Sequence, residues 1–205
     1  MSKPVLYGIS GSRAFRSIWA AEEIGLAYEH VPTSFRGDAQ SAEYLSVNPN
    51  GRIPALVDGG LKLFESMAIN MYLAKKYANG LIPEGEDAEA RTWQWSVWGI
   101  SEIEPLQMQI VVQKFFTPED KRDSGVIERA GKALSRPFNV LNATLESSDY
   151  LLGDTFSLAD LNLAGVMDLL NMVQHDVSAW PAMARWLDAC YARESYVRAK
   201  AVGVA

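Results

Sequence analysis

Two hydroxyl groups stand in a short loop where they could serve an anionic ligand. Ser10 and Ser12 belong to the segment SGSRA, which separates a short β-prone run, PVLYGI, from a helical stretch. Ligands of α/β proteins commonly bind at loops that follow the carboxyl ends of strands, and a nearby helix N-terminus favours negative charge. The two serines could therefore donate hydrogen bonds to an anion, although flexible turn residues would look the same.

A second polar pair, Glu65–Ser66, lies between the apolar run LKLF and a helical segment. The plain interpretation is a strand end followed by a helix whose N-cap is Ser66. The alternative is a binding site, in which the helix N-terminus and the Ser66 hydroxyl bind a carboxylate while Glu65 binds an ammonium. Together these groups would hold an amino-acid head group, which carries both charges.

Pro54 follows Ile53 and begins a strand-like run, ALVD. Proline has no N–H to donate to a sheet, so the backbone before it is free to pair with another group. A cis Ile53–Pro54 bond would present the N–H and C=O of Ile53 to an extended peptide. Only about 5–6% of X–Pro bonds in folded proteins are cis, so the residues alone favour a trans bond.

Strands and helices that can position these groups alternate in the first part of the chain. A β-prone run at 4–9 precedes a helix over about 14–24, a strand within AYEHVP and a short helix around 41–45. The β-α-β opening implies parallel pairing of its two strands. Gly59–Gly60 between two apolar runs predicts a hairpin, and a helix is expected from Ser66 to about Tyr77.

Strand signals nearly vanish after about residue 86. One long helical segment is expected to bend at Pro105, because proline removes an interior hydrogen bond, and a second spans about 118–146. The sequence thus predicts an α/β plus all-α protein, with an α/β domain over 1–80, a Gly- and Pro-containing linker at 81–85 and an all-helical domain over 86–205.

Within the helical part, the segment FSLADLNLAG carries a helix-start signature. Ser157 and Asp160 have the spacing of a capping box, and Phe156 and Leu161 occupy the positions of a hydrophobic staple. Asp160 could also be a catalytic carboxylate, but the spacing favours a folding signal.

Composition narrows the classes of function. The net charge of −6 argues against nucleic acid as the main partner. With one cysteine, Cys190, and two histidines, His30 and His175, an internal disulfide is excluded and a metal site is not expected. No apolar run approaches the roughly 20 residues that span a bilayer. The N-terminus lacks the long apolar core of a secretion signal, so a cytoplasmic location is expected.

Four segments, SGSRAFRSIWAAEEIGL, NPNGRIPALVDGG, LFESMAINMYLAKKY and FSLADLNLAG, resemble a cytosolic glutathione transferase in their order and spacing. The resemblance covers essentially the whole chain and is closest to bacterial members with a serine at the activating position. It implies a thioredoxin-like N-terminal domain that binds glutathione as co-substrate and a helical C-terminal domain with the electrophile site. It also implies a cytoplasmic homodimer.

The resemblance assigns roles to the residues that bind glutathione. Pro54 would be a cis proline, and the backbone of Ile53 would pair with the cysteinyl unit of glutathione. Glu65 and Ser66 would hold the γ-glutamyl end, and Arg52 would reach the glycyl carboxylate.

Ser12 matches the activating serine through the spacing Ser-x-x-x-Arg to Arg16. A hydroxyl that points at sulfur stabilises the thiolate and so lowers the pKa of the thiol. One such bond contributes about 1.5–3 kcal/mol, or roughly one to two pKa units. Ser10 could do the same work and ranks second. Tyr7 ranks third, because its place in a strand favours packing into the core.

The electrophile pocket is harder to place. Trp95 and Trp98, on the first long helix, and Met108 farther along are candidates for its wall. Trp93 is nearby, and at these spacings the three tryptophans cannot all share one helix face. Core packing is the plain alternative for them.

The function implied is conjugation of glutathione to small hydrophobic electrophiles, or reduction of a peroxide by glutathione. The alternative is a non-catalytic glutathione-binding or scaffold protein with the same fold. A Ser-His-Asp hydrolase ranks far lower, because the G-x-S-x-G elbow does not occur in the sequence.

Overall fold

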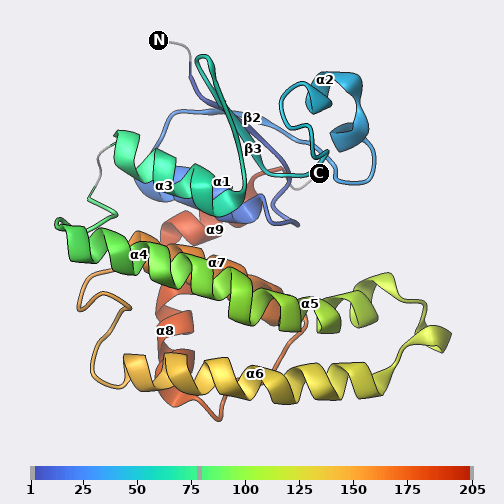
Figure 1. Cartoon of the computed structure of the whole chain (residues 1–205), viewed down its shortest axis with the longest axis vertical. Helices are drawn as coiled ribbons and strands as arrows, with labels where there is room; N and C mark the ends of the chain where they lie inside the picture. Colours follow the sequence, from blue (N-terminus) through green and yellow to red (C-terminus); the bar gives the residue numbers. More distant parts are fainter. Residues whose placement is uncertain (1–2, 78–79, 204–205) are drawn as a thin grey trace. The chain divides into compact units, whose positions relative to one another are not determined.

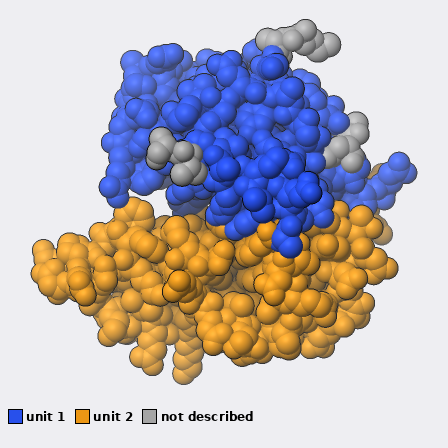
Figure 2. All heavy atoms as spheres, turned by 180° about the vertical axis from the view of Figure 1, so that it is seen from behind, with its two compact units in different colours: residues 1–84, 192–205 blue, residues 85–191 orange. Residues whose placement is uncertain are grey.

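The structure is a computed structural model that describes residues 3–77 and 80–203. The chain divides into two compact units (Figure 2). Unit 1 comprises Met1–Glu84 and Ala192–Ala205, and unit 2 comprises Gly85–Tyr191. The end of the chain therefore differs from expectation, because residues 192–205 belong with the α/β unit and not with the helical one.

Unit 1 contains a four-stranded sheet in the order β2-β1-β3-β4. The strands are β1 (Val5–Tyr7), β2 (Glu29–Val31), β3 (Ala55–Asp58) and β4 (Leu61–Phe64). β1 and β2 run parallel, as the β-α-β pattern predicts. β3 runs antiparallel to β1 and, through the Gly59–Gly60 turn, to β4, which confirms the hairpin.

The helices of unit 1 are α1 (Phe15–Ile24), α2 (Ala42–Leu45), α3 (Ser66–Tyr77) and α9 (Glu194–Ala201), and a 3₁₀ turn, η1 (Asp38–Gln40), precedes α2. α1 packs against both α3 and α9 (Figure 1). It ends at Gly25, whose φ of 69° is left-handed, as the sequence predicts for a helix C-terminus.

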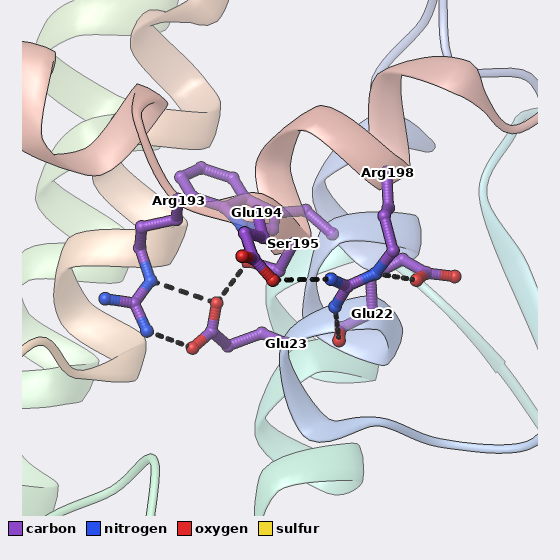
Figure 3. A network of polar contacts seen from close by, with 7 residues as sticks. Glu22, Glu23, Arg193, Glu194, Ser195 and Arg198 are labelled. Atoms are coloured by element: carbon purple, nitrogen blue, oxygen red, sulfur yellow. Dashed lines mark hydrogen bonds and ion pairs between the residues drawn. The ribbon is translucent and has the colours of Figure 1, made fainter.

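Polar contacts fasten α9 to α1 (Figure 3). The carboxylate of Glu23 accepts hydrogen bonds from the Arg193 guanidinium and the Ser195 hydroxyl. Arg198 donates from Nε to the carboxylate of Glu22 at 3.0 Å. Both acids lie in the last turns of α1, so these contacts join α1 to α9, about 170 residues farther along the chain.

Aromatic packing reinforces this joint. The ring of Tyr196 stands edge-on to Phe15 and Trp19, with centroids 5.3 and 5.1 Å apart, and Trp19 Nε1 donates to Ser195 Oγ at 3.0 Å. Trp19 is fully buried. This packing explains why residues 192–205 cluster with unit 1.

Unit 2 is all-helical. Its elements are α4 (Glu86–Trp98), the π-helical η2 (Gly99–Ile103), α5 (Glu104–Val111), the π-helical η3 (Val112–Phe116), the 3₁₀ turn η4 (Glu119–Lys121), α6 (Ser124–Leu145), α7 (Leu158–Met172) and α8 (Pro181–Tyr191). α7 is central, since it packs against α4, α5 and α8, and most of its residues are buried. The irregularity expected at Pro105 is a π-helical turn just before it, and Pro105 lies in the first turn of α5.

The start of α7 is organised by the expected capping box of Ser157 and Asp160. The fully buried Asp160 carboxylate accepts hydrogen bonds from the N–H of Leu151 at 2.8 Å and from Trp186 Nε1 at 2.9 Å. It also accepts bonds from the N–H and hydroxyl of Ser157. Burial raises the pKa of Asp160, and these donors partly offset the rise. Asp160 thus fastens α7 to its neighbours, in agreement with the folding interpretation.

Across the described residues, the structure contains no helix with the length and hydropathy needed for a membrane span.

Candidate functional site

The register of the sheet brings three candidate segments to one end of unit 1. Ala55 pairs with Tyr7 of β1 on one side and with Phe64 of β4 on the other. Because β3 is antiparallel to both neighbours, its amino end lies beside their carboxyl ends. The loop after β1, the Ile53–Pro54 pair before β3 and the Glu65–Ser66 pair after β4 therefore meet at the same end of the sheet.

The loop after β1 places the two serines differently. Ser10 is 7% exposed, and Ser12 is half-buried. The Ser12 hydroxyl donates to the carbonyl of Ile9 at 2.7 Å and accepts from the N–H of Ala14 at 3.1 Å, just before α1 begins. To donate to a ligand, this hydroxyl must rotate away from Ile9. It lies at the N-terminal end of α1, where negative charge is stabilised.

The other residues named for this loop have structural contacts. Tyr7 lies in β1, and its ring stands edge-on to Tyr44 with centroids 5.7 Å apart. Arg16 is 2% exposed, within the buried part of α1. His30 Nε2 is 2.8 Å from the Gly8 carbonyl. In unit 2, His175 packs on the ring of Phe138. His30 thus contacts a backbone carbonyl, and His175 packs on a phenyl ring.

The Ile53–Pro54 peptide bond is cis. The resemblance implies this geometry, whereas the frequency of cis bonds alone favours trans. The side chains of Ile53 and Pro54 are buried and that of Arg52 is exposed. The Arg52 side chain is therefore open to solvent, and the backbone of Ile53 lies at the end of the sheet, just before β3.

Glu65 and Ser66 occupy the junction of β4 and α3, but their capping roles differ from those expected. α3 begins at Ser66, and the carbonyl of Glu65 accepts the N–H of Ile69 at 2.9 Å. Glu65 is therefore the N-cap, and Ser66 is the first helical residue. Glu65 has a φ of 72°, a left-handed conformation that is uncommon outside glycine and is often found at functional sites. Its side chain is exposed, and Ser66 is 6% exposed.

The candidate electrophile residues lie in unit 2 and differ in exposure. Trp95 is 8% exposed, and its ring stands edge-on to that of Trp98 at 5.2 Å. Trp98 and Met108 are half-buried. The sequence reasoning did not single out Phe115 and Phe116, which end the π-helical η3 and are 52% and 50% exposed. The only sequence signal for them is an aromatic pair after a lysine.

Two further residues that were missed support the cis-proline loop. The carbonyl of Arg52 accepts hydrogen bonds from the hydroxyl of Tyr44 and from Nδ2 of Asn48, each at 2.6 Å. Neither residue type predicts such a contact, because the partner is a backbone carbonyl. Among the described residues, no group of three or more His, Cys, Asp or Glu side chains is arranged to hold a metal.

Two family models match the chain. The family model described as "Glutathione S-transferase, N-terminal domain" matches residues 3–75, and that described as "Glutathione S-transferase, C-terminal domain" matches residues 103–194. Glutathione S-transferase 3 of Zea mays is 35% identical, over 93% of this chain and 90% of that protein.

Solved structures give the same result. The structure of glutathione S-transferase-I with lactoylglutathione bound has a TM-score of 0.88 and 32% identity, and the match covers 98% of this chain and 99% of that one. A glutathione transferase of Burkholderia graminis, with two glutathione molecules bound per subunit, has a TM-score of 0.90 and 29% identity, over 98% and 89%. The predicted fold class, a thioredoxin-like domain followed by a helical domain, is confirmed.

Proposed function

The chain belongs to the glutathione S-transferase family, and from this premise we propose that it activates glutathione with the Ser12 hydroxyl at the end of the sheet described above. It is a glutathione transferase, with glutathione as its co-substrate. The observation that carries the site assignment is the pairing of Ala55 with both Tyr7 and Phe64, because it gathers the three candidate segments.

In the proposed reaction the glutathione thiol loses its proton to solvent and the thiolate attacks an electrophilic carbon. A C–S bond forms, and the leaving group departs with the electron pair. Ser12 donates a hydrogen bond to the sulfur and favours the charged form. With a peroxide as acceptor, the thiolate attacks oxygen, the O–O bond breaks, and an alcohol leaves after taking up a proton from solvent. The thiol of a second glutathione then attacks the resulting sulfenic acid, which forms the disulfide and releases water.

Binding of the tripeptide is assigned to groups on both sides of this hydroxyl. The backbone of Ile53, beside Pro54, pairs with the cysteinyl unit. Glu65 and the N-terminal end of α3 at Ser66 hold the ammonium and carboxylate of the γ-glutamyl unit. The exposed guanidinium of Arg52 binds the glycyl carboxylate.

Ser12 is preferred to Ser10 because it is the less buried of the two and its hydroxyl lies at the N-terminal end of α1. The proposed subgroup, bacterial members with an activating serine, rests on the same assignment. Ser10 stays the second choice.

The second substrate is proposed to be a small hydrophobic electrophile. Trp98 and Met108 are half-buried and keep surface for such a ligand, whereas Trp95, at 8% exposure, keeps little. The exposed pair Phe115 and Phe116 adds apolar surface to the same unit. We assign glutathione to unit 1 and the electrophile to unit 2.

A homodimer in the cytoplasm completes the proposal. It is supported by the family membership of the chain. Sedimentation of the purified protein tests the dimer, and cell fractionation tests the location.

The ultraviolet difference spectrum of the protein saturated with glutathione, recorded across pH, tests the function. Thiolate that forms well below the pKa of free glutathione is the expected result. Binding without a lowered thiol pKa would favour the non-catalytic alternative, and absence of binding would refute both.

A further inference from the structure

The carbonyl of Arg52 is held by two buried donors on one side of the candidate site. Tyr44, in α2, is 4% exposed, and Asn48, in the following loop, is 1% exposed. The Tyr44 hydroxyl and the Asn48 amide each lie 2.6 Å from this oxygen. A carbonyl has two lone pairs, so two donors saturate it. The Arg52 carbonyl is thereby fixed in direction.

Fixing this carbonyl also fixes the N–H of Ile53. The two groups belong to one planar peptide unit and point in opposite directions. Among the described residues, none accepts a hydrogen bond from the Ile53 N–H. The Ile53 N–H therefore has a fixed direction and is available to donate to a ligand.

The two anchoring side chains are themselves held in place. The Tyr44 N–H donates to Ser41 Oγ at 3.2 Å, and its ring packs on Tyr7. Burial raises the pKa of Tyr44 to about 12, so its phenol keeps its proton at neutral pH and can donate. Oδ1 of Asn48 accepts from the N–H and Nδ2 of Asn50, which leaves Nδ2 of Asn48 to face the Arg52 oxygen.

The preceding peptide is held from the same side. Gln40 Nε2 donates to the Gly51 carbonyl at 2.9 Å. Gly51 has a φ of 59°, and a Cβ there would stand 2.6 Å from Gln40 Nε2. The segment from η1 to Asn48 thus forms a brace behind the cis-proline loop, with contacts to two successive carbonyls.

We propose that Tyr44 is a positioning residue for glutathione: its hydroxyl, with the Asn48 amide, sets the Arg52–Ile53 peptide plane so that the Ile53 N–H meets the cysteinyl unit. The inference rests on the proposed function, since it assumes that glutathione pairs with this backbone. Tyr44 touches no substrate in this arrangement and acts through the peptide.

The test is Tyr44→Phe, which removes the hydroxyl and keeps the ring. KM is measured for glutathione and for γ-glutamylcysteine, a dipeptide that lacks the glycyl carboxylate. Losing one hydrogen bond behind the peptide should raise both KM values by the same factor, about three- to tenfold. The value of kcat at saturating glutathione should not change. Asn48→Asp, which keeps the bonds from Asn50 but removes the donor to Arg52, should show the same pattern.

The matched control is Tyr28→Phe. The Tyr28 hydroxyl lies in the same unit and donates to Glu22 at 3.0 Å. Thermal unfolding with and without glutathione separates structure from positioning. A lower melting temperature with unchanged KM values would overturn the proposal, because it would mean a purely structural role.

Three other outcomes are equally decisive. A KM that rises for glutathione alone would mean that Tyr44 acts through the Arg52 side chain and the glycyl carboxylate, and this would overturn the peptide-plane argument. If the unaltered protein does not bind glutathione, the proposed function fails and this inference falls with it. Binding by the unaltered protein with no effect of Tyr44→Phe would refute this inference only.

Discussion

Arg193 and Glu23 lie 170 residues apart in the chain and are joined by two hydrogen bonds, one of them from Nε at 3.0 Å. Ser195 donates to the same carboxylate. Burial pushes the pKa of Glu23 upward, but the bonds and the positive charge of Arg193 outweigh burial, and the net pKa is lowered. The carboxylate therefore stabilises the folded state in its charged form.

Glu23→Gln should lower the free energy of unfolding at pH 7 by about 1–3 kcal/mol, because charge-assisted bonds become neutral ones. Because folding lowers the pKa of the Glu23 carboxyl, the charged carboxylate stabilises the folded state at pH values above the pKa in the unfolded chain, about 4.3. This stabilisation is lost as the pH falls through the pKa of the folded state. The difference between the two proteins should therefore shrink below about pH 4. Urea unfolding across pH measures it, and a difference that does not vary with pH would contradict the argument.

Ser12→Ala should reduce kcat/KM for conjugation at neutral pH by roughly ten- to a hundredfold, the effect of losing one hydrogen bond to a charged group. The difference in kcat/KM between the variant and the unaltered protein should become smaller at high pH, where the glutathione thiol ionises without a hydrogen bond from Ser12. Ser10→Ala is the matched comparison and should cost much less. The reverse pattern in the pH–rate profiles would move the activating role to Ser10.

Asp160→Asn should destabilise the protein by at least about 2 kcal/mol, since buried donors from Leu151 and Trp186 lose a charged acceptor. Activity per folded molecule should be retained. Thermal unfolding together with specific activity of the folded fraction separates these effects. A stable variant without activity would restore the catalytic interpretation of Asp160.

Gly8→Ala should lower both stability and glutathione affinity. Gly8 has a φ of 137°, and a Cβ there would stand 2.2 Å from the Cβ of Ala14, so the serine loop must move. Gly11 lies in the same loop, and a Cβ there would meet nothing within 4 Å. Gly11→Ala should therefore be far less destabilising in thermal unfolding, and equal losses would argue against the steric explanation.

Local signals in the sequence predicted the elements well. Gly59–Gly60 predicts the hairpin, Gly25 predicts the end of α1, and Ser157 with Asp160 predicts the start of α7, because each depends on neighbours within a few residues. The Ser66 cap was wrong for a local reason as well. The left-handed φ of Glu65 places the N-cap at Glu65, one residue before the expected Ser66. Glutamate as a residue type does not indicate that conformation.

Contacts between distant residues were not predictable in the same way. The anchoring of Arg193 to Glu23 and of Tyr44 to the Arg52 carbonyl depends on tertiary placement, which one sequence does not encode in its spacing. The resemblance predicted that the candidate site segments serve one ligand. The sheet register supplies the physical reason why they lie close together.

The return of α9 to α1 sets an order of events during protein synthesis. Phe15 and Trp19 are synthesised about 180 residues before their partner Tyr196. At about 5–20 residues per second, the nascent chain carries this uncovered aromatic surface for on the order of ten to forty seconds. Closure of unit 1 around this surface therefore cannot precede the synthesis of Tyr196, and a chain that terminates before that residue leaves the aromatic face of α1 uncovered.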